Sequence, residues 1–452
     1  MRLAFYGATD TVTGSRYLLS GQHGGHLLVD CGMFQGLKQL RLRNWDRLPF
    51  DVSKIDAVLL THAHIDHSGF LPRLIKEGFK GRVYCTHSTL ALCELLLPDS
   101  GRLQEEQAEF ENRHKLSKHA QALPLYTEDD ARQALKHLDP VPFDETFSPL
   151  DGWSVRFRHA GHILGAASVR VSNEGRSVLF SGDLGRSDDL VMKPPEPPEE
   201  ADVLVVESTY GDRLHPDGDA LAQLADVINR TAARGGQVVI PSFAVGRAQT
   251  LLHCISQLKQ ARRIPDLPVY LNSPMAVDAT RIYSHHAGEH RLSKQECSEL
   301  GHVAKFAQTV EESMALNRLS WPSIIISASG MATGGRVLHH LKAYAPNPRC
   351  TILFTGHQAA GTRGATLVGG AKTVKIFGEY VPVRAEVANL DMLSAHADRD
   401  DLLDWMAAMP KPPSRVYITH GEPVAADALR LAIQDRLGWP CEVPEYRQSV
   451  RV

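Results

Sequence analysis

The sequence predicts an α/β fold in which a layered domain is interrupted by a second α/β domain built on parallel strands. The first ~60 residues and the stretch 153–183 contain short apolar segments separated by glycine turns, which is typical of strands. After residue 200, apolar runs alternate with helical patterns, which indicates parallel strands joined by crossover helices. Near Lys372 the pattern changes again, which indicates a return to the first domain.

The first domain begins with four predicted strands, at 2–7, 15–20, 26–32 and 56–64. Helical patterns follow at Ser68–Lys76, Ser88–Leu97 and Glu105–Lys115. Three further strands are predicted at 153–161, 166–172 and 176–183. The run KPPEPPEE at 193–200 predicts a surface loop, because proline excludes a helix interior and a central strand.

The middle of the chain contains the near-continuous apolar runs VLVVES, QVVIPSF, PVYLNS, SIIISASG and CTILFTG. Helical patterns such as Leu221–Ala233 and Arg247–Gln260 separate them, so these strands are expected to be buried on both faces. Later strand patterns are TVKIFG, VRAEVANL and RVYITHG. The predicted domains are 1–205 for the first part of the layered domain, 206–373 for the inserted domain and 374–452 for the completing segment.

Composition excludes some classes of protein. The 452 residues are enough for two or three domains, and 43% are hydrophobic. The net charge of -3 gives no support to a nucleic-acid partner. The longest apolar runs are far below the ~18–20 residues of a membrane span, so no membrane partner is expected. The first residues lack the apolar centre of a signal peptide, and seven scattered cysteines favour a reduced, cytoplasmic protein.

The strongest chemical signal is the segment His62-Ala-His64-Ile-Asp66-His67 at the end of a predicted strand. It holds four side chains that can bind metal within six positions. In an extended turn, His62 and His64 point to one side, while Asp66 and His67 can reach another, which suits two adjacent metal sites. Imidazole nitrogen with carboxylate oxygen favours zinc, with manganese or iron as alternatives.

Three later residues lie where they can complete these sites. His162 lies between two predicted strands, and Asp183 and His420 each follow an apolar strand, so all three are expected at one edge of a layered fold. Considered alone, His162 is explained by a structural or solvent-exposed role. Asp183, with two glycines nearby, is explained by a role in a turn. The joint pattern favours metal binding.

Two groups of motifs carry a family resemblance. HAHIDH (62–67), GHILGA (161–166) and SGDLGR (181–186) resemble motifs of the metallo-β-lactamase superfamily, and Asp30 in LLVDCG resembles its first motif, whose aspartate supports the metal loop. Other segments resemble the β-CASP nucleases, which include bacterial and archaeal RNA-processing enzymes. These segments are ESTYGDR (207–213), PSFAVGRAQ (241–249), SASGMATGGR (327–336), SAHAD (394–398) and THGE (419–422).

The resemblance covers nearly the whole chain and implies an αββα metallo-β-lactamase sandwich with an inserted parallel-sheet β-CASP domain. It implies two zinc ions, with Mn²⁺ as the alternative. The implied ligands of the first are His62, His64, His162 and Asp183, and those of the second are Asp66, His67, His420 and the shared Asp183. Glu207, His396 and His420 match the family's motifs A, B and C.

The implied activity is hydrolysis of phosphodiester bonds in single-stranded RNA through a hydroxide that bridges the two metals. Asp66 belongs to the catalytic residues as well as to the ligands. We expect His396 to protonate the leaving ribose oxygen, and Glu207 to hold its ring and favour the imidazolium form. Endonuclease and 5′-exonuclease action both stay open at this point.

Glycine-rich loops are candidates for binding RNA phosphates. SASGMATGG follows an apolar strand and precedes a helical pattern that begins near Arg336, and backbone N–H groups at a helix start attract anions. GHQAAGTRG (356–364) is a second such loop, although plain turn chemistry explains both equally well. The candidate substrate contacts are Ser329, Gly330, Thr333, Gly334, Arg247, Arg336 and Arg363.

Three alternatives compete with a ribonuclease. DNA-directed β-CASP members resemble this pattern with valine at motif C, so His420 favours RNA. A small-molecule (thio)ester or lactone metallohydrolase would share the zinc motifs without needing the long insertion. A non-catalytic scaffold would have lost metal ligands, and none is missing here. No RNA-binding module precedes the first strand, so RNA affinity is expected from the cleft, a partner or a homodimer.

Overall fold

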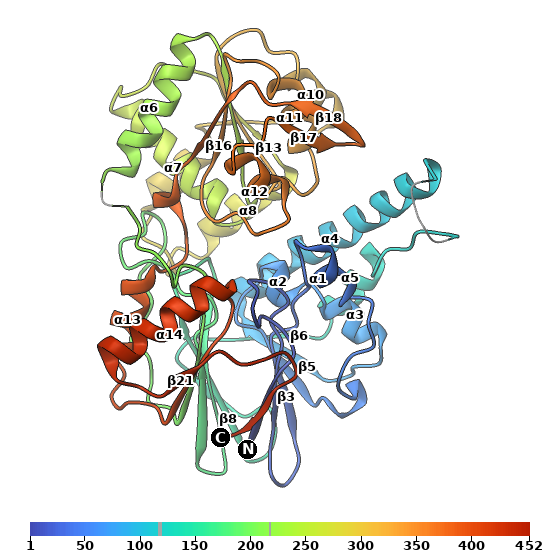
Figure 1. Cartoon of the computed structure of the whole chain (residues 1–452), viewed down its shortest axis with the longest axis vertical. Helices are drawn as coiled ribbons and strands as arrows, with labels where there is room; N and C mark the ends of the chain where they lie inside the picture. Colours follow the sequence, from blue (N-terminus) through green and yellow to red (C-terminus); the bar gives the residue numbers. More distant parts are fainter. Residues whose placement is uncertain (116–119, 217) are drawn as a thin grey trace. The chain divides into compact units, whose positions relative to one another are not determined.

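The computed structural model describes residues 1–115, 120–216 and 218–452. The chain forms two compact units (Figure 1). The first unit consists of Met1–Leu214 and His396–Val452, and the second consists of His215–Ala395. The second unit is thus an insertion within the first, and the predicted α/β class is confirmed.

The first unit contains two seven-stranded sheets. One sheet has the order β22 (Ser449–Arg451), β1 (Arg2–Phe5), β2 (Tyr17–Ser20), β3 (His26–Val29), β4 (Ala57–Leu59), β5 (Arg82–Thr86) and β6 (Leu138–Val141). The other has the order β21 (Cys441–Glu442), β20 (Arg415–Ile418), β11 (Val203–Val206), β10 (Arg176–Phe180), β9 (Ala167–Asn173), β8 (Trp153–His159) and β7 (Thr146–Phe147).

The two sheets pack face to face around a shared apolar core. Phe5 and Leu27 from the first sheet and Phe157, Val169 and Phe180 from the second belong to one buried cluster. Burying each such side chain contributes about 1.5–3 kcal/mol. Helices pack on the outer faces (Figure 1). They are α2 (Ile65–Ser68), α3 (Leu71–Lys76), α4 (His87–Arg113) and α5 (Glu128–Leu135) on one side, and α13 (Arg399–Ala407) and α14 (Pro423–Leu437) on the other. The expected αββα sandwich is present.

Helix α4 differs from its prediction, because it is one continuous helix where two were expected at Ser88–Leu97 and Glu105–Lys115. Pro98 lies inside it and removes one backbone hydrogen bond. Packing outweighs this local cost. Leu92 and Leu97 are fully buried, and a Cβ at Gly101 would lie 2.6 Å from the Thr127 carbonyl oxygen. Even this longest helix is not apolar enough to cross a membrane, and neither is any other helix within the described ranges.

The second unit contains a six-stranded sheet in which every pair is parallel, as predicted. The strand order is β14 (Lys305–Phe306), β13 (Val269–Asn272), β15 (Ser323–Ser327), β12 (Gln237–Pro241), β16 (Thr351–Phe354) and β19 (Glu386–Asn389). A hairpin of β17 (Thr373–Ile376) and β18 (Glu379–Pro382) is separate. The helices are α6 (Ala220–Ala233), α7 (Arg247–Gln260), α8 (Pro274–His285), α9 (Lys294–Leu300), α10 (Val310–Leu316), α11 (Val337–Tyr344) and α12 (Arg363–Val368).

One group of strands lies in a different unit from the predicted one. β11 resembles the apolar runs that follow it, but it lies almost wholly within the predicted first part (1–205), and it pairs in parallel with β10 and β20 of the first unit. β17, β18 and β19 follow the predicted return at 374 but belong to the second unit, where β19 pairs with β16. An apolar run buried on both faces has the same pattern in either sheet, so sequence alone does not assign it.

Candidate metal centre

The residues of the centre follow neighbouring strands of the first unit. β10, β11 and β20 are parallel neighbours, so their carboxyl ends meet at one edge, which is where such sheets usually place functional groups. Asp183, Glu207 and His420 follow these three strands directly. The loop that carries His62–His67 follows β4, and a bridge between Gly185 and His396 brings the latter to the same edge.

The first ligand group consists of His62, His64, His162 and Asp183. His64 Nδ1 lies 3.2 Å from both His62 Nε2 and His162 Nε2. Asp183 Oδ2 lies 3.6 Å from His62 Nε2 and 3.7 Å from His162 Nε2. Four donors bound tetrahedrally at ~2.0–2.1 Å from a zinc ion would lie about 3.3–3.4 Å apart. The spacing of these buried atoms therefore fits a tetrahedral metal site.

The second group consists of Asp66, His67 and His420. His420 Nε2 lies 3.0 Å from His67 Nε2 and 3.3 Å from Asp66 Oδ2. The other oxygen of Asp183, Oδ1, lies 3.2 Å from His67 Nε2. The two oxygens of one carboxylate thus face the two groups separately, which suits a ligand shared by two metal ions.

The electrostatics favour the metal-binding protonation states of His62, His64 and Asp183. Burial lowers the pKa of His62 well below its usual value and lowers that of His64 to about 4, so both rings are neutral at pH 7. Burial alone would raise the pKa of Asp183. The neighbouring His420 and His67 outweigh burial and hold the pKa of Asp183 well below the ordinary value, so this carboxylate is ionised. Neutral imidazole and ionised carboxylate are the forms that bind zinc. At His67 the neighbouring carboxylates outweigh burial and raise the pKa well above its usual value, so a bound metal would displace a proton from that ring.

Asp30 supports the loop that carries the metal-ligand candidates His62–His67. Its Oδ1 accepts a hydrogen bond from the Thr61 N–H at 2.8 Å, and its Oδ2 accepts one from the Thr61 hydroxyl at 2.9 Å. Asp30 Oδ2 also lies 2.8 Å from His67 Nδ1. An ionised carboxylate only accepts, so His67 carries its proton on Nδ1 and turns the lone pair of Nε2 toward the ligand group.

Two threonines that the sequence analysis did not single out fix the tautomers of two further histidines. The Thr61 hydroxyl donates its one proton to Asp30, so it accepts from His62 Nδ1 at 3.1 Å. The Thr209 hydroxyl donates to the His420 carbonyl oxygen at 3.2 Å, so it accepts from His420 Nδ1, also at 3.2 Å. Each ring then presents an unprotonated Nε2 to the ligand groups.

Replacing Thr209 with Val is expected to weaken metal binding by about 10- to 100-fold, because His420 loses the acceptor that fixes its tautomer. Thr209→Ser keeps the hydroxyl and should bind metal as the wild type does. Competition with a chromophoric chelator measures both affinities. Equal metal affinity in the Val and Ser variants would exclude this role for the hydroxyl.

The buried Glu207 and the partly buried His396 form a pair beside the ligand groups. His396 Nδ1 lies 3.1 and 3.2 Å from the two Glu207 oxygens. The Leu184 and Thr209 N–H groups also donate to Glu207, which is 1% exposed. Burial lowers the pKa of His396, but the charge and hydrogen bond of Glu207 outweigh burial and raise it above its usual value. The His396 ring therefore keeps its proton to higher pH than a free histidine does.

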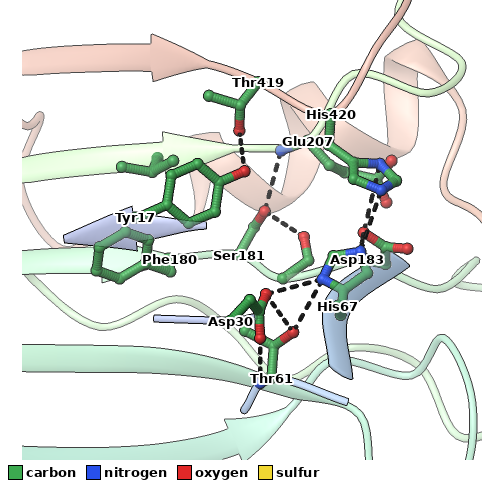
Figure 2. A pocket seen from close by; sticks show the side chains of 12 residues that line it. Tyr17, Asp30, Thr61, His67, Phe180, Ser181, Asp183, Glu207, Thr419 and His420 are labelled. Atoms are coloured by element: carbon green, nitrogen blue, oxygen red, sulfur yellow. Dashed lines mark hydrogen bonds and ion pairs between the residues drawn. The ribbon is translucent and has the colours of Figure 1, made fainter. Parts of the chain in front are cut away.

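A small pocket behind the ligands shows further residues absent from the sequence-based set (Figure 2). The Tyr17 hydroxyl donates to Thr419 Oγ1 at 3.0 Å and so links β2 of one sheet to the end of β20 in the other. Ser181 Oγ accepts from the Glu207 N–H at 3.0 Å. These contacts fix the backbone next to Glu207 and His420. The sequence shows which residues carry hydroxyl groups, but no local pattern predicts the hydrogen-bond partner of each hydroxyl.

The candidate substrate contacts all lie in the second unit. Arg336 donates to Asn272 Oδ1 and to the Ala307 carbonyl oxygen, and Arg363 donates to the carbonyl oxygens of Lys375 and Thr333. Both guanidinium groups thus hold the backbone of neighbouring loops. Other candidates are Ser329, whose hydroxyl accepts from the Thr333 N–H, Gly330 and Gly334. The buried Arg247 is the first residue of α7. Their contact with RNA stays a prediction.

Comparison with known proteins finds three family models along the chain. The model described as "Metallo-beta-lactamase superfamily" matches residues 10–242, more than half of the chain. The "Beta-Casp domain" model matches residues 248–367. The model described as "Zn-dependent metallo-hydrolase RNA specificity domain" matches residues 380–444.

Individual proteins are similar over nearly the full length. Ribonuclease TTHA0252 of Thermus thermophilus is 38% identical, over 93% of each chain. An RNase J-like protein of Methanocaldococcus jannaschii is 30% identical, over 98% of this chain and 97% of its own. A crystal structure of a protein described as of unknown function, from Enterococcus faecalis, has the same fold, with a TM-score of 0.55 and 12% identity over 99% of both chains.

Proposed function

This chain belongs to the metallo-β-lactamase superfamily and to its β-CASP group, and we propose that it is a metal-dependent ribonuclease acting on single-stranded RNA. The observation that carries the proposal is the division of the Asp183 oxygens between two buried ligand groups. A pair formed by Glu207 and His396 lies beside them. The name of the relative from Thermus thermophilus and the description of the third family model support RNA as the substrate.

Two zinc ions fit the donor atoms, with Mn²⁺ as the alternative. His62, His64, His162 and Asp183 would hold the first, and Asp66, His67, His420 and Asp183 the second. Bound there, the two ions supply Lewis-acid chemistry, which polarises the phosphate and activates water at neutral pH. The donor spacing, the neutral His62 and the ionised Asp183 all favour this assignment.

His396 is the general acid that this chain supplies for the reaction. A ribose oxygen is a poor leaving group unless it is protonated, and a positioned acid contributes about 10²- to 10⁴-fold to such a step. Glu207 holds Nδ1 of the ring, so Nε2 is the atom that carries the transferable proton. After transfer, the Glu207 charge favours return of a proton to the ring.

RNA is preferred over DNA because His420 occupies the motif C position, where DNA-directed members have valine. In this structure His420 takes part in the second ligand group, so the discriminating residue is part of the centre itself. A small-molecule esterase would need the ligand groups alone, whereas here the chain also forms the complete parallel-sheet insertion.

The test compares matched single-stranded RNA and DNA oligonucleotides, labelled at the 5′ end, with zinc-loaded protein. We expect cleavage of RNA at a rate well above that of DNA, and the product ladder separates endonuclease from 5′-exonuclease action. Intact RNA in the presence of a fully loaded centre would reject the proposal and favour the small-molecule hydrolase. Equal rates on RNA and DNA would reject His420 as the discriminator.

A further inference from the structure

A basic and aromatic surface lies on the segment that follows β3 in the first unit. Helix α1 (Lys38–Leu42) has no buried residue, and Trp45 and Arg47 after it are exposed. Leu42 is 53% exposed and Trp45 is 51% exposed. We call this surface the α1 patch, and it consists of Lys38, Arg41, Leu42, Arg43, Trp45 and Arg47.

The positive charges of the α1 patch outnumber the acids near them, of which Asp51 interacts electrostatically with Arg47. Among the described residues, no carboxylate forms an ion pair with its four cations, whereas arginines elsewhere, such as Arg73 and Arg132, are paired. Asp46 is the one acid in the sequence between Leu37 and Arg47. In a chain of net charge -3, this is a local concentration of positive charge beside an exposed indole.

A short segment of the chain connects the α1 patch to residues that are hydrogen-bonded to the His62–His67 loop. The Cys31 N–H donates to the His67 carbonyl oxygen at 2.7 Å, and the Met33 N–H donates to the Ile65 carbonyl oxygen at 2.9 Å. Lys38 is five positions after Met33, which limits the distance between their Cα atoms to about 18 Å. The patch thus lies within a few nucleotides' reach of the ligand residues.

The base of the α1 patch is also fixed. Asn44 is buried, and its side-chain amide exchanges two hydrogen bonds with the backbone of Phe34, at 2.9 and 2.8 Å. Arg43 lies over the Tyr446 ring, 4.4 Å from its centre. The segment is therefore held at both ends, and Trp45 projects from a fixed backbone rather than from a loose loop.

We propose that the α1 patch is a docking surface for single-stranded RNA, which holds substrate nucleotides outside the metal centre. Lys38, Arg41 and Arg47 neutralise backbone phosphates, and Trp45 stacks on one base. Lysine and arginine supply the sequence-independent part of nucleic-acid binding, and an exposed aromatic ring stacks on any base. The proposal rests on the proposed ribonuclease function.

The test measures binding of a fluorescent 12-nucleotide RNA by anisotropy in EDTA, so that cleavage does not interfere. Trp45→Ala should weaken binding by about 5- to 100-fold, the range expected for loss of one stacked base. The triple variant Lys38→Gln/Arg41→Gln/Arg47→Gln should make the slope of log K against log salt shallower by up to about 2, since each phosphate contributes about 0.7. In the zinc-loaded protein, KM should rise while kcat stays within about twofold.

The matched controls carry the same chemical changes elsewhere. Trp321→Ala removes a tryptophan of equal exposure, 49%, and should bind RNA as the wild type does. Lys80→Gln/Lys294→Gln/Arg318→Gln removes the same charge from exposed cations that form no ion pair with any described residue, and should leave the salt slope unchanged. Circular dichroism and metal content verify folding.

The possible failures are distinguishable. If the wild type cleaves RNA and the α1-patch variants bind it as tightly as the wild type, the docking surface is rejected and the ribonuclease stands. If the wild type binds RNA through the patch but never cleaves it, the activity is rejected. The α1-patch variants could instead bind RNA normally but change oligomeric state or lose binding to anionic vesicles. Either result would assign the patch to another occupant and overturn the proposal.

Discussion

Replacing Asp183 with Ala is expected to remove metal from the centre and to lower RNA cleavage by at least about 10³-fold, because activation of water at neutral pH depends on the bound ions. The two oxygens of this carboxylate face both ligand groups, at 3.6 Å from His62 Nε2 and 3.2 Å from His67 Nε2. Without it, the remaining donors of the first group are three histidines, and none of them is a carboxylate. Both groups should therefore lose affinity together.

The measurement pairs metal analysis after gel filtration with cleavage of the labelled RNA. Asp188→Ala is the matched control, because Asp188 lies on the same loop and its side chain is 68% exposed. The control should retain both metal and activity. If Asp183→Ala retained the wild-type metal content and rate, Asp183 would not be the shared ligand, and the two-metal centre proposed here would be wrong.

The family and the general architecture were predictable because the signals lie close together in the sequence. The HAHIDH segment places four donors on one loop, and apolar strands precede Asp183 and His420. Since parallel strands end at the same edge of a sheet, those residues were expected to converge, and the structure brings them together. The motif resemblance to the metallo-β-lactamase superfamily and the β-CASP group is confirmed by the family matches.

Features that depend on long-range packing were not predictable in the same way. The continuous α4 depends on contacts of Gly101 with the start of α5, which no local pattern around Pro98 indicates. The strand β11 enters the sheet of the first unit because β10 and β20 flank it. The roles of Thr61 and Thr209 follow from counting the one proton of each hydroxyl, which requires its partners to be known. A sequence shows the hydroxyl but not the partners.

Replacing His396 with Ala is expected to lower RNA cleavage by about 10²- to 10⁴-fold while the metal content stays that of the wild type. The metal content should not change because His396 belongs to neither four-residue ligand set. Its ring is positioned instead by Glu207, whose carboxylate binds Nδ1. His23→Ala, at a histidine whose side chain is 88% exposed in the same unit, is the control and should change neither quantity.

A substrate whose leaving group needs no proton separates an acid from a merely structural residue. On a p-nitrophenyl phosphodiester, the leaving phenolate is stable by itself, so His396→Ala should lose little activity, and the large defect should appear only on RNA. Glu207→Gln should follow the same pattern with a smaller loss, because the amide still orients the ring but no longer favours its charged form. Equal losses on both substrates would mean that His396 supports the shape of the centre, and loss of metal in the variant would make it a ligand. The rate ratio between the two substrates therefore assigns the role of His396 more directly than the rate on RNA alone.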